Sequence, residues 1–416
     1  MKFVVTIVAA LVIGGGVHGF DTTTPTAFVQ MKNTFHASLG TRTTSARSLV
    51  TMMALAPGQT PVVIGVAADS GCGKSTFMRR LTSTFGGDVV GPLGGGFDGG
   101  GWETNTLVSD LTTVICLDDY HLNDREGRKK TKLTALDIRE NNFDLMYEQV
   151  KALKNGKSVS KPIYNHVNGT LDKPETIDPT PIIIFEGLHP MHDKRVRDLL
   201  DFSLYLDISD EVKLNWKIQR DMEERGHSLE SILASIEARK PDFDSYIAPQ
   251  KEFADCIIEV LPTLLDPDDT KTLRVRLIQK EGVEYFTPCY LFDEGSEIEW
   301  MPCGTKLSCS YPGIKFASAP DTYFDNRVQI LEMDGTFDNI AEMVYVESYL
   351  SSTSTNYYGE LSRAMIQLQD APGSDNGTGL MQTLAAFAIR ELYVKKNAAE
   401  QLKDLDEAVK EKILQK

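Results

Sequence analysis

A cysteine stands inside a glycine-rich segment whose other residues are suited to holding phosphate. The segment ADSGCGKST, residues 68–76, has Ala68 at its first position and Gly-Lys-Ser five residues later. In such a loop, successive backbone N–H groups and a helix N-terminus converge on a phosphate. Lys74 is then placed to reach the β and γ phosphates of a nucleotide, and Ser75 to hold Mg²⁺. The pattern predicts a nucleotide site between a strand and a helix.

Acidic side chains follow two further runs of apolar residues. CLDDYH, residues 116–121, places Asp118 and Asp119 after one run, and Glu186 ends the other in IIIFEGLHP. Ligands of parallel α/β sheets bind beyond the carboxyl ends of the strands. One carboxylate there could accept the proton of an attacking hydroxyl, and another could order Mg²⁺. Taken alone, the Asp-Asp pair is equally common as a plain turn or helix cap.

The segment KIQRDMEERG adds cations to a strongly acidic chain. Lys217, Arg220, Asp221 and Arg225 fall roughly on one face of a predicted helix. A solvated face is the usual fate of such a run, but three cations in this spacing also suit a phosphorylated substrate. The 416 residues include 43 basic and 59 acidic side chains, a net charge of −16. That balance disfavours a nucleic-acid binder.

The candidate site residues must be positioned by strands and helices. From residue 61 onward, the sequence shows alternating strand and helix signals. Strands are expected over 61–67, 112–119, 180–187, 202–209 and 255–262, and helices over 74–85, 143–156, 210–226 and 228–240. The glycine-rich stretch 86–105 is predicted to be a long loop. The alternation indicates an α/β fold with a mostly parallel sheet flanked by helices. After about residue 270, short strand signals predict antiparallel additions, and helices close the chain.

The first residues are typical of targeting sequences. Residues 1–19 hold a lysine and then an apolar run too short to span a bilayer comfortably, as in a signal peptide. Residues 20–56 are rich in Ser and Thr and nearly free of acids, as in a transit peptide. The pair predicts import into a plastid through the secretory route. A secreted protein with a disordered leader is the alternative. The fold is expected over 57–416.

Together these segments resemble the phosphoribulokinases of plant and algal chloroplasts. The resemblance rests on ADSGCGKSTFMRRLTS, TTVICLDDYH, KPIYNHV, EGLHPM, KIQRDMEERGHSLESI, EARKPDFD and MPCGTKLSCSYPGIKF, and runs from about residue 61 to 394. It implies one domain, with a P-loop core over 57–265 and a sheet extension with C-terminal helices over 266–416. It also implies transfer of the ATP γ-phosphoryl group to the 1-hydroxyl of ribulose 5-phosphate, a step of carbon fixation in the Calvin cycle, with Mg²⁺.

The resemblance also assigns roles, position by position. Asp118 matches the general base, with Lys74 and Lys217 beside the phosphates in transit. Glu186 and Asp221, with Ser75, match the positions near the metal. The nucleotide contacts are Gly71, Cys72, Gly73, Lys74, Ser75 and Thr76, and the sugar-phosphate contacts are His121, Arg125, Arg220, Arg225 and Arg239.

The six cysteines are too few for a disulfide scaffold in a chain of this length. The helix N-terminus and Lys74 are expected to lower the pKa of the Cys72 thiol. In the resembled family, the positions of Cys72 and Cys116 form a disulfide that blocks ATP binding and that thioredoxin reduces. Cys303 and Cys309 match a second redox pair, linked to docking with glyceraldehyde-3-phosphate dehydrogenase through a small disordered linker protein. The family is also dimeric. Without the resemblance, Cys72 is a small filler and Cys116 a buried strand residue.

Two other functions compete with this interpretation. A uridine-kinase-like phosphotransferase shares the phosphate loop and the strand-end aspartate, but gives no reason for the cations of 217–225. A non-catalytic scaffold is disfavoured by the intact Lys74, Ser75, Asp118 and Glu186.

Overall fold

The structure, a computed structural model, describes residues 60–69, 71–85, 90–93, 106–108, 111–166, 168–223, 228–283, 314–337, 339–343, 359–371 and 373–414. At some of these, Ser75, Lys217, Arg220 and Asp221 among them, it describes the backbone alone. The predicted leader, residues 1–56, lies outside the described residues, as do residues 284–292 and 296–304, where short antiparallel strands are expected.

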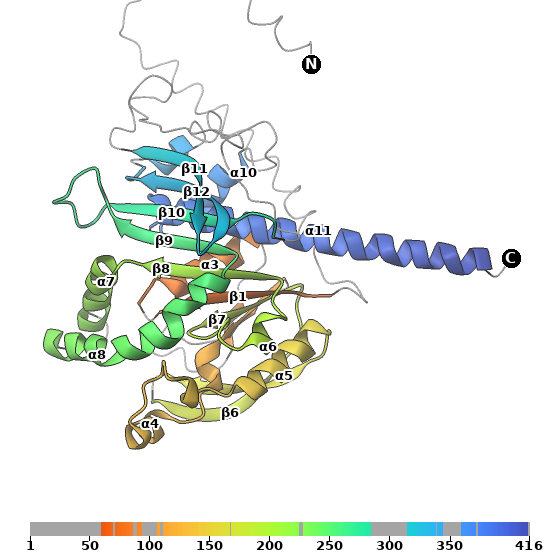
Figure 1. Cartoon of the computed structure of the whole chain (residues 1–416), viewed down its shortest axis with the longest axis horizontal. Coiled ribbons are helices and arrows are strands. Elements are labelled where there is room, and N and C mark those ends of the chain that lie inside the picture. The colour runs from red at the N-terminus through yellow and green to blue at the C-terminus, as the bar shows by residue number, and fades with distance from the viewer. Residues whose placement is uncertain are drawn as a thin grey trace, which may run out of the picture. The chain divides into compact units, whose positions relative to one another are not determined.

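Five parallel strands form the centre of the sheet (Figure 1). They lie in the order β9 (Cys256–Pro262), β8 (Phe202–Ile208), β1 (Val62–Ala68), β7 (Ile182–Gly187) and β4 (Thr112–Cys116). Every residue of β1, β7 and β4 is buried. Short runs rich in Val, Ile and Thr, buried on both sides, are what a parallel sheet covered by helices requires. The predicted α/β fold is confirmed.

Antiparallel strands extend both edges of this centre. β10 (Leu273–Lys280), β12 (Asn326–Asp334) and β11 (Lys315–Tyr323) follow β9, and β3 (Thr106–Val108) and β2 (Val90–Leu93) follow β4, giving ten strands within the described residues. The prediction of a loop over 86–105 is therefore wrong at 90–93. The segment VGPL of β2 carries a glycine and a proline, which hide a strand signal, and an edge strand is where proline is tolerated.

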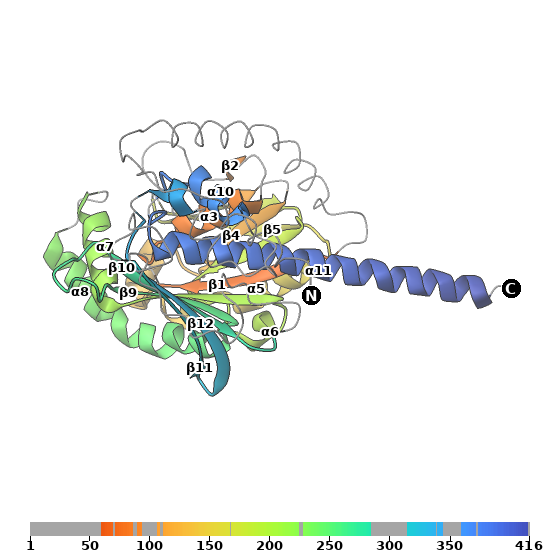
Figure 2. The same cartoon turned by 90° about the horizontal axis from the view of Figure 1, so that it is seen from above.

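Helices cover both faces of the sheet. α5 (Phe143–Lys154) buries Met146, Val150 and Leu153 against Val63 and Phe185, which point to one face. α11 (Gly377–Leu414) packs against α3 (Lys74–Phe85) and contacts β1, β9 and β10. Figure 2 shows α11 lying across the sheet. Because side chains alternate along a strand, the even-numbered residues of β1 face α3 and α11 while the odd-numbered ones face α5.

The remaining elements connect the strands or flank the sheet. Two helices, α7 (Asp210–Glu223) and α8 (Leu229–Asp242), follow β8, and a separate hairpin pairs β5 with β6. The others are α4 (Arg125–Thr131), α6 (Lys194–Arg197), α10 (Glu360–Gln367), β5 (Val159–Asn165), β6 (Thr170–Ile177), and the single turns η2 (Leu117–Tyr120), η3 (Ile138–Glu140), η4 (Phe243–Ile247), η5 (Ala248–Phe253) and η6 (Ile340–Glu342).

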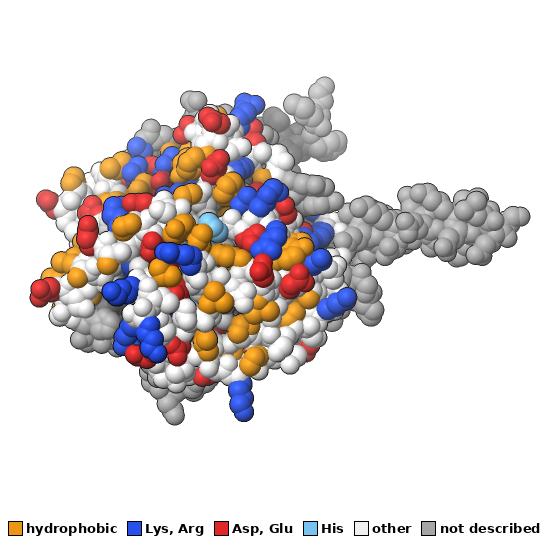
Figure 3. Space-filling view, turned by 60° about the horizontal axis from the view of Figure 1, so that its bottom comes forward, with side chains coloured by type: hydrophobic (Ala, Val, Ile, Leu, Met, Phe, Trp, Pro, Cys, Tyr) orange, Lys and Arg blue, Asp and Glu red, His pale blue; other side chains and the backbone are white. Residues whose placement is uncertain are grey.

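Among the described helices, none combines the length and the apolar character that crossing a bilayer demands. On the face that Figure 3 shows, basic and acidic side chains are intermixed rather than segregated by sign. The excess of acids over bases is therefore not gathered into one anionic patch there.

Candidate active site

The phosphate loop joins β1 to α3 as the sequence predicts. Gly71 and Gly73 have φ of 86° and 69°, values that side chains other than hydrogen rarely allow. α3 begins at Lys74, and Phe77 N donates its first helical bond to Gly73 O at 3.1 Å. The loop therefore presents backbone N–H groups and a helix N-terminus on one side. α7 passes beside it, since a Cβ on Gly73 would lie 3.5 Å from the Trp216 ring.

Lys74 reaches across the strand ends to Glu186. Its Nζ lies 2.5 Å from Glu186 Oε2, and the two side chains are 17% and 9% exposed. Burial alone would lower the pKa of Lys74, but the nearby groups Glu186, Cys116 and Asp118 together outweigh burial and raise that pKa above its ordinary value. Lys74 is therefore protonated at neutral pH, and a cation lies where a nucleotide phosphate would bind.

Asp118 lies beyond the end of β4, facing two imidazoles. The predicted strand over 112–119 stops at Cys116, and the chain turns into η2, which carries Asp118. His121 Nε2 lies 3.8 Å from Asp118 Oδ1, and His166 Nε2 lies 3.6 Å from Asp118 Oδ2. His166 follows the last residue of β5 and was given no role by the sequence, although it stands in the segment KPIYNHV. Only the fold brings it to Asp118.

The charge state of this cluster follows from its surroundings. Burial alone would raise the pKa of Asp118, but the two facing imidazoles and the charges of Lys74 and Arg239 lower it to about 2. Burial lowers the pKa of His121, and it lowers that of His166 to about 4. Near pH 7 the cluster therefore holds an ionised carboxylate between two neutral imidazoles.

Asp119 fixes the hairpin that carries His166. Its carboxylate forms a buried ion pair with Lys161 and accepts a hydrogen bond from Tyr164 N at 2.7 Å. Lys161 also lies 3.0 Å from Glu175 on the facing strand. The side chains of Asp119 and Lys161 are 2% and 1% exposed. The two aspartates therefore have different surroundings: Asp118 is partly exposed and faces two imidazoles, whereas Asp119 is buried and anchors β5.

Cations from α7 and α8 meet the phosphate loop from the other side. Lys213 Nζ lies 3.4 Å from Asp69 Oδ2, and Arg239 Nη2 lies 3.7 Å from Asp69 Oδ1. Burial works against the charge of Lys213, but Asp69 raises its pKa. Arg239 is therefore close to the site as predicted. Lys213, in the segment ISDEVKLNWK, is a further cation there that the sequence did not single out.

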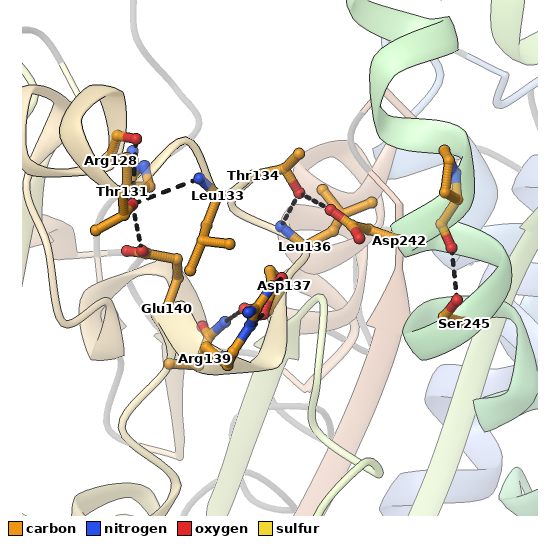
Figure 4. Close-up of polar contacts among 12 residues, drawn as sticks. Arg128, Thr131, Leu133, Thr134, Leu136, Asp137, Arg139, Glu140, Asp242 and Ser245 are labelled. Carbon is orange, nitrogen blue, oxygen red and sulfur yellow. Dashed lines mark hydrogen bonds and ion pairs between the residues drawn. The ribbon is translucent and has the colours of Figure 1, made fainter.

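Residues 121–141 form a segment beside the site that is held by its own polar contacts (Figure 4). The Glu140 carboxylate is fully buried and accepts hydrogen bonds from Thr131 Oγ1 at 2.8 Å and Asn123 Nδ2 at 3.0 Å. Thr134 Oγ1 donates to Asp242 Oδ2 at 2.6 Å, which ties the segment to the end of α8 (Figure 4). The segment therefore keeps a fixed relation to the helix that carries Arg239.

Arg125, predicted to bind the sugar phosphate, starts α4 within this segment. Its N–H donates to Gly169 O at 2.8 Å, and its Nη2 donates to His166 O at 2.8 Å. Gly169, at φ 76°, could not carry a side chain, because a Cβ would lie 2.6 Å from Arg125 Nε. The turn of the β5–β6 hairpin and α4 are thus locked together, and His121, Arg125 and His166 share one rim.

Cys72 and Cys116 are both buried free thiols, and the expectation that Cys72 has a lowered pKa is wrong. Burial, with the charge of Asp69, raises the pKa of Cys72 to about 12, and burial raises that of Cys116 well above its ordinary value. The two cysteines also follow strands that are not neighbours in the sheet. β7 separates β1 from β4, so the two strand axes are about 10 Å apart.

Several predicted residues cannot be placed with the others. Only the backbone of α7 is described at Lys217, Arg220 and Asp221, and of α3 at Ser75. The positions of Arg225, Cys303 and Cys309 lie outside the described residues. The described side chains that the fold does bring together at the strand ends are Lys74, Asp118, His121, Arg125, His166, Glu186, Lys213 and Arg239.

Comparison with known proteins matches this architecture to one family. Residues 63–265 fit the model of the "Phosphoribulokinase / Uridine kinase family". A chloroplastic phosphoribulokinase of Arabidopsis thaliana is 68% identical over 337 residues, 80% of this chain and 84% of that one. The chloroplastic phosphoribulokinase of Chlamydomonas reinhardtii is 59% identical over 368 residues, 88% of this chain and 97% of that one.

The other branch of the family is more distant. A uridine kinase of Limosilactobacillus reuteri (strain DSM 20016) is 30% identical over 208 residues, 50% of this chain and 86% of that one. Similarity to the phosphoribulokinases covers 337 and 368 residues, against 208 for the uridine kinase. The chain therefore belongs to the phosphoribulokinase family of kinases.

Proposed function

We propose that this site transfers the γ-phosphoryl group of ATP to the 1-hydroxyl of ribulose 5-phosphate, giving ribulose 1,5-bisphosphate and ADP. The carrying observation is the Asp118 carboxylate, set at the strand ends between two neutral imidazoles and within the influence of Lys74. A proton acceptor and a phosphate-binding loop at the same edge of the sheet support an in-line transfer between them.

The ATP phosphates would be bound by the phosphate loop, which comprises Gly71, Cys72, Gly73, Lys74, Ser75 and Thr76. Its N–H groups bind phosphate oxygens, and Lys74 exchanges Glu186 for the γ-phosphate. Catalysis of phosphoryl transfer consists mainly of positioning and charge neutralisation, so this cation acts on the group in transit. Lys217 is proposed for the same task from α7, on its sequence alone.

The sugar phosphate, which accepts the phosphoryl group, would be bound and deprotonated by the Asp118 cluster. A carboxylate with a pKa of about 2 is ionised but a weak base. The negative charge of the two bound substrates raises that pKa, which strengthens the base when it is needed. His121 and His166, being neutral, can hydrogen-bond sugar hydroxyls without holding Asp118 in an ion pair. Arg125 and Arg239 would pair with the 5-phosphate, and Arg220 and Arg225 are proposed there from sequence.

The residues present fit a magnesium ion beside the phosphate loop. Glu186 offers a carboxylate oxygen at the end of β7, and oxygen is the donor that Mg²⁺ prefers. Ser75 and Asp221 are proposed as further ligands from their positions in the sequence. When bound, Mg²⁺ would neutralise charge on the β and γ phosphates.

An assay of ADP release tests substrate and activity together. The purified chain, freed of its leader and reduced, is given ATP and Mg²⁺ with either ribulose 5-phosphate or uridine. We expect turnover with the sugar phosphate and background release with uridine. Preferential turnover of uridine would reject the proposal in favour of the uridine-kinase-like alternative, and no turnover with either would favour the scaffold.

We further propose that a Cys72–Cys116 disulfide inactivates the enzyme. Two S–H bonds would be lost and one S–S bond formed, with both electrons and both protons passing to a protein disulfide such as oxidised thioredoxin, which becomes a dithiol. The high pKa values of both thiols make this reaction slow in the present arrangement. Because β7 lies between β1 and β4, the phosphate loop must also move over the end of β7 before the two sulfurs can bond.

Incubation with oxidised or reduced thioredoxin before the activity assay tests this control. Oxidised thioredoxin should inactivate the enzyme and its Cys256→Ser variant, and should leave Cys116→Ser at its own starting activity. Equal activity of the untreated chain in both states would reject the switch. The pair Cys303 and Cys309, the dimer and the dehydrogenase partner stay predictions from the resemblance.

A plastid location is proposed because the relatives are named chloroplastic. Entry through the secretory route is proposed from residues 1–56 alone. Fusing residues 1–56, and separately 20–56, to a fluorescent protein tests the route, since only the longer leader should then reach the plastid.

A further inference from the structure

Three donor atoms of different chemistry converge beside the proposed base. The sulfur of Cys116, a carboxylate oxygen of Asp118 and an imidazole nitrogen of His166 all lie within 4.8 Å of one another. They come from the end of β4, from η2 and from the turn after β5, so the fold rather than a local motif assembles them. A thiol, an imidazole and a carboxylate form the donor set that zinc prefers, whereas magnesium favours oxygen alone.

We propose that Cys116, Asp118 and His166 form an inhibitory binding site for Zn²⁺ or a similar thiophilic divalent ion. The site is separate in kind from the magnesium position at Glu186. The softer ligands favour zinc at this site, and the oxygen ligand favours magnesium at Glu186. Neither nucleotide nor sugar phosphate is needed to form the zinc site.

The distances suit a tetrahedral ion after small side-chain rotations. Zinc bonds of about 2.0 Å to nitrogen and oxygen set those two donors about 3.3 Å apart, and a bond of about 2.3 Å to sulfur sets it about 3.5 Å from them. Asp118 Oδ2 and His166 Nε2 already lie 3.6 Å apart. The buried His166 Nε2 has no hydrogen-bond partner, so binding an ion would break no existing bond of that atom.

Access to the three ligands also permits binding. Cys116 is buried at 2% exposure, but the side chains of Asp118 and His166 are 25% and 26% exposed, so an ion can enter from their side. On binding, the S–H bond breaks, the S–Zn bond forms and the proton passes to solvent. Water would complete the coordination, as in zinc sites with three protein ligands.

The inhibitory consequence rests on the proposed role of Asp118, since a carboxylate bound to zinc cannot accept a proton. Zinc would also hold Cys116 away from Cys72. Reduced enzyme exposed to zinc should therefore lose activity, regain it with a chelator, and resist thiol alkylation at Cys116.

Titration of the reduced chain with Co²⁺, a spectroscopic substitute for zinc, tests the site without any activity assay. A phosphine reductant keeps the thiols free without competing for metal. The chain and its Cys256→Ser variant, altered at another buried cysteine, should give a thiolate-to-cobalt absorption band. Cys116→Ser should lose the band, and His166→Asn should weaken zinc binding at least about tenfold.

The outcomes separate cleanly. A band retained in Cys116→Ser would place the metal on another cysteine and overturn the proposal, as would unchanged zinc affinity in both Cys116→Ser and His166→Asn. If the band behaves as expected but bound zinc leaves turnover intact, the metal site stands and the role of Asp118 as base fails.

Discussion

At the scale of single residues, some side chains of the site can be identified from the sequence, and others only from the fold. Lys74 and Asp118 could be identified because each stands in a local motif at the end of a strand. His166 could not, because nothing near it in the chain marks it as facing Asp118. The pKa of Cys72 was predicted in the wrong direction, because a sequence shows the helix N-terminus but not the burial that outweighs it.

Replacing Asp118 with Asn tests the base at this scale. The amide keeps the shape but cannot accept a proton, so we expect kcat to fall by about 10²–10⁴-fold while KM for both substrates changes little. Steady-state kinetics with ATP and ribulose 5-phosphate measure this. Asp178→Asn, at an exposed acid whose bond is to Ser158, serves as the control and should keep full turnover. Near-normal kcat in Asp118→Asn would remove that residue from the role.

At the scale of elements, the acceptor side of the site depends on two pieces that the sequence did not delineate. The β5–β6 hairpin went unpredicted because its outward strand, β6, is mostly exposed and polar and so lacks an alternating signal. The segment 121–141 consists of the short helix α4 and turns held by side chains such as Glu140, whose partners cannot be inferred from spacing. By contrast, α3 and α5 were predicted closely because their buried faces repeat at helical spacing.

Asp119→Asn should loosen the hairpin. The amide oxygen can still accept from Tyr164 N, but Lys161 loses its buried counter-charge, which typically costs about 3 kcal/mol or more of stability. Because β5 carries His166, KM for ribulose 5-phosphate should rise more than KM for ATP. Urea unfolding and steady-state kinetics give the two readouts. Glu175→Gln, removing the less buried partner of Lys161, should lose less; equal losses would contradict this account.

Thr134→Val should separate the segment 121–141 from α8. It removes the donor to Asp242 and the acceptor for Leu136 N, both drawn in Figure 4. If the lost hydrogen bond contributes about 1 kcal/mol to the binding free energy of the sugar phosphate, KM for that substrate should rise about fivefold, with kcat nearly unchanged. Ser245→Ala is the matched control, since its hydroxyl bonds Pro241 O within its own helical turn. An equal rise in both variants would argue against a specific tether.

At the scale of the whole molecule, the parallel centre was predictable and the edges were not. Long buried runs such as IIIFEG identify central strands, whereas β2 and β3 are short, and β11, KFASAPDTY, mixes small and polar residues. Burial in the loop after β7 leaves histidines neutral there. His189, 1% exposed, packs edge-on against Phe143 at 5.8 Å and His192 at 5.7 Å between ring centroids.

These neutral histidines should make the fold sensitive to mild acid. Burial, with His192, lowers the pKa of His189 to about 3, against about 6.5 when unfolded. The unfolded state then binds the extra proton. The contribution of His189 to the free energy of unfolding is therefore fully present above about pH 6.5 and falls as pH drops toward 3, by about 1.4 kcal/mol per pH unit.

His189→Asn removes this titration. Its unfolding free energy, measured in urea from pH 7 to 5, should therefore decline less steeply than that of the unaltered chain, whatever its absolute stability. Subtracting the two slopes cancels the other titrating groups. His192→Asn, at a half-buried neighbour, should flatten the slope less. Parallel slopes in the His189 variant and the unaltered chain would show that folding does not lower the pKa of His189.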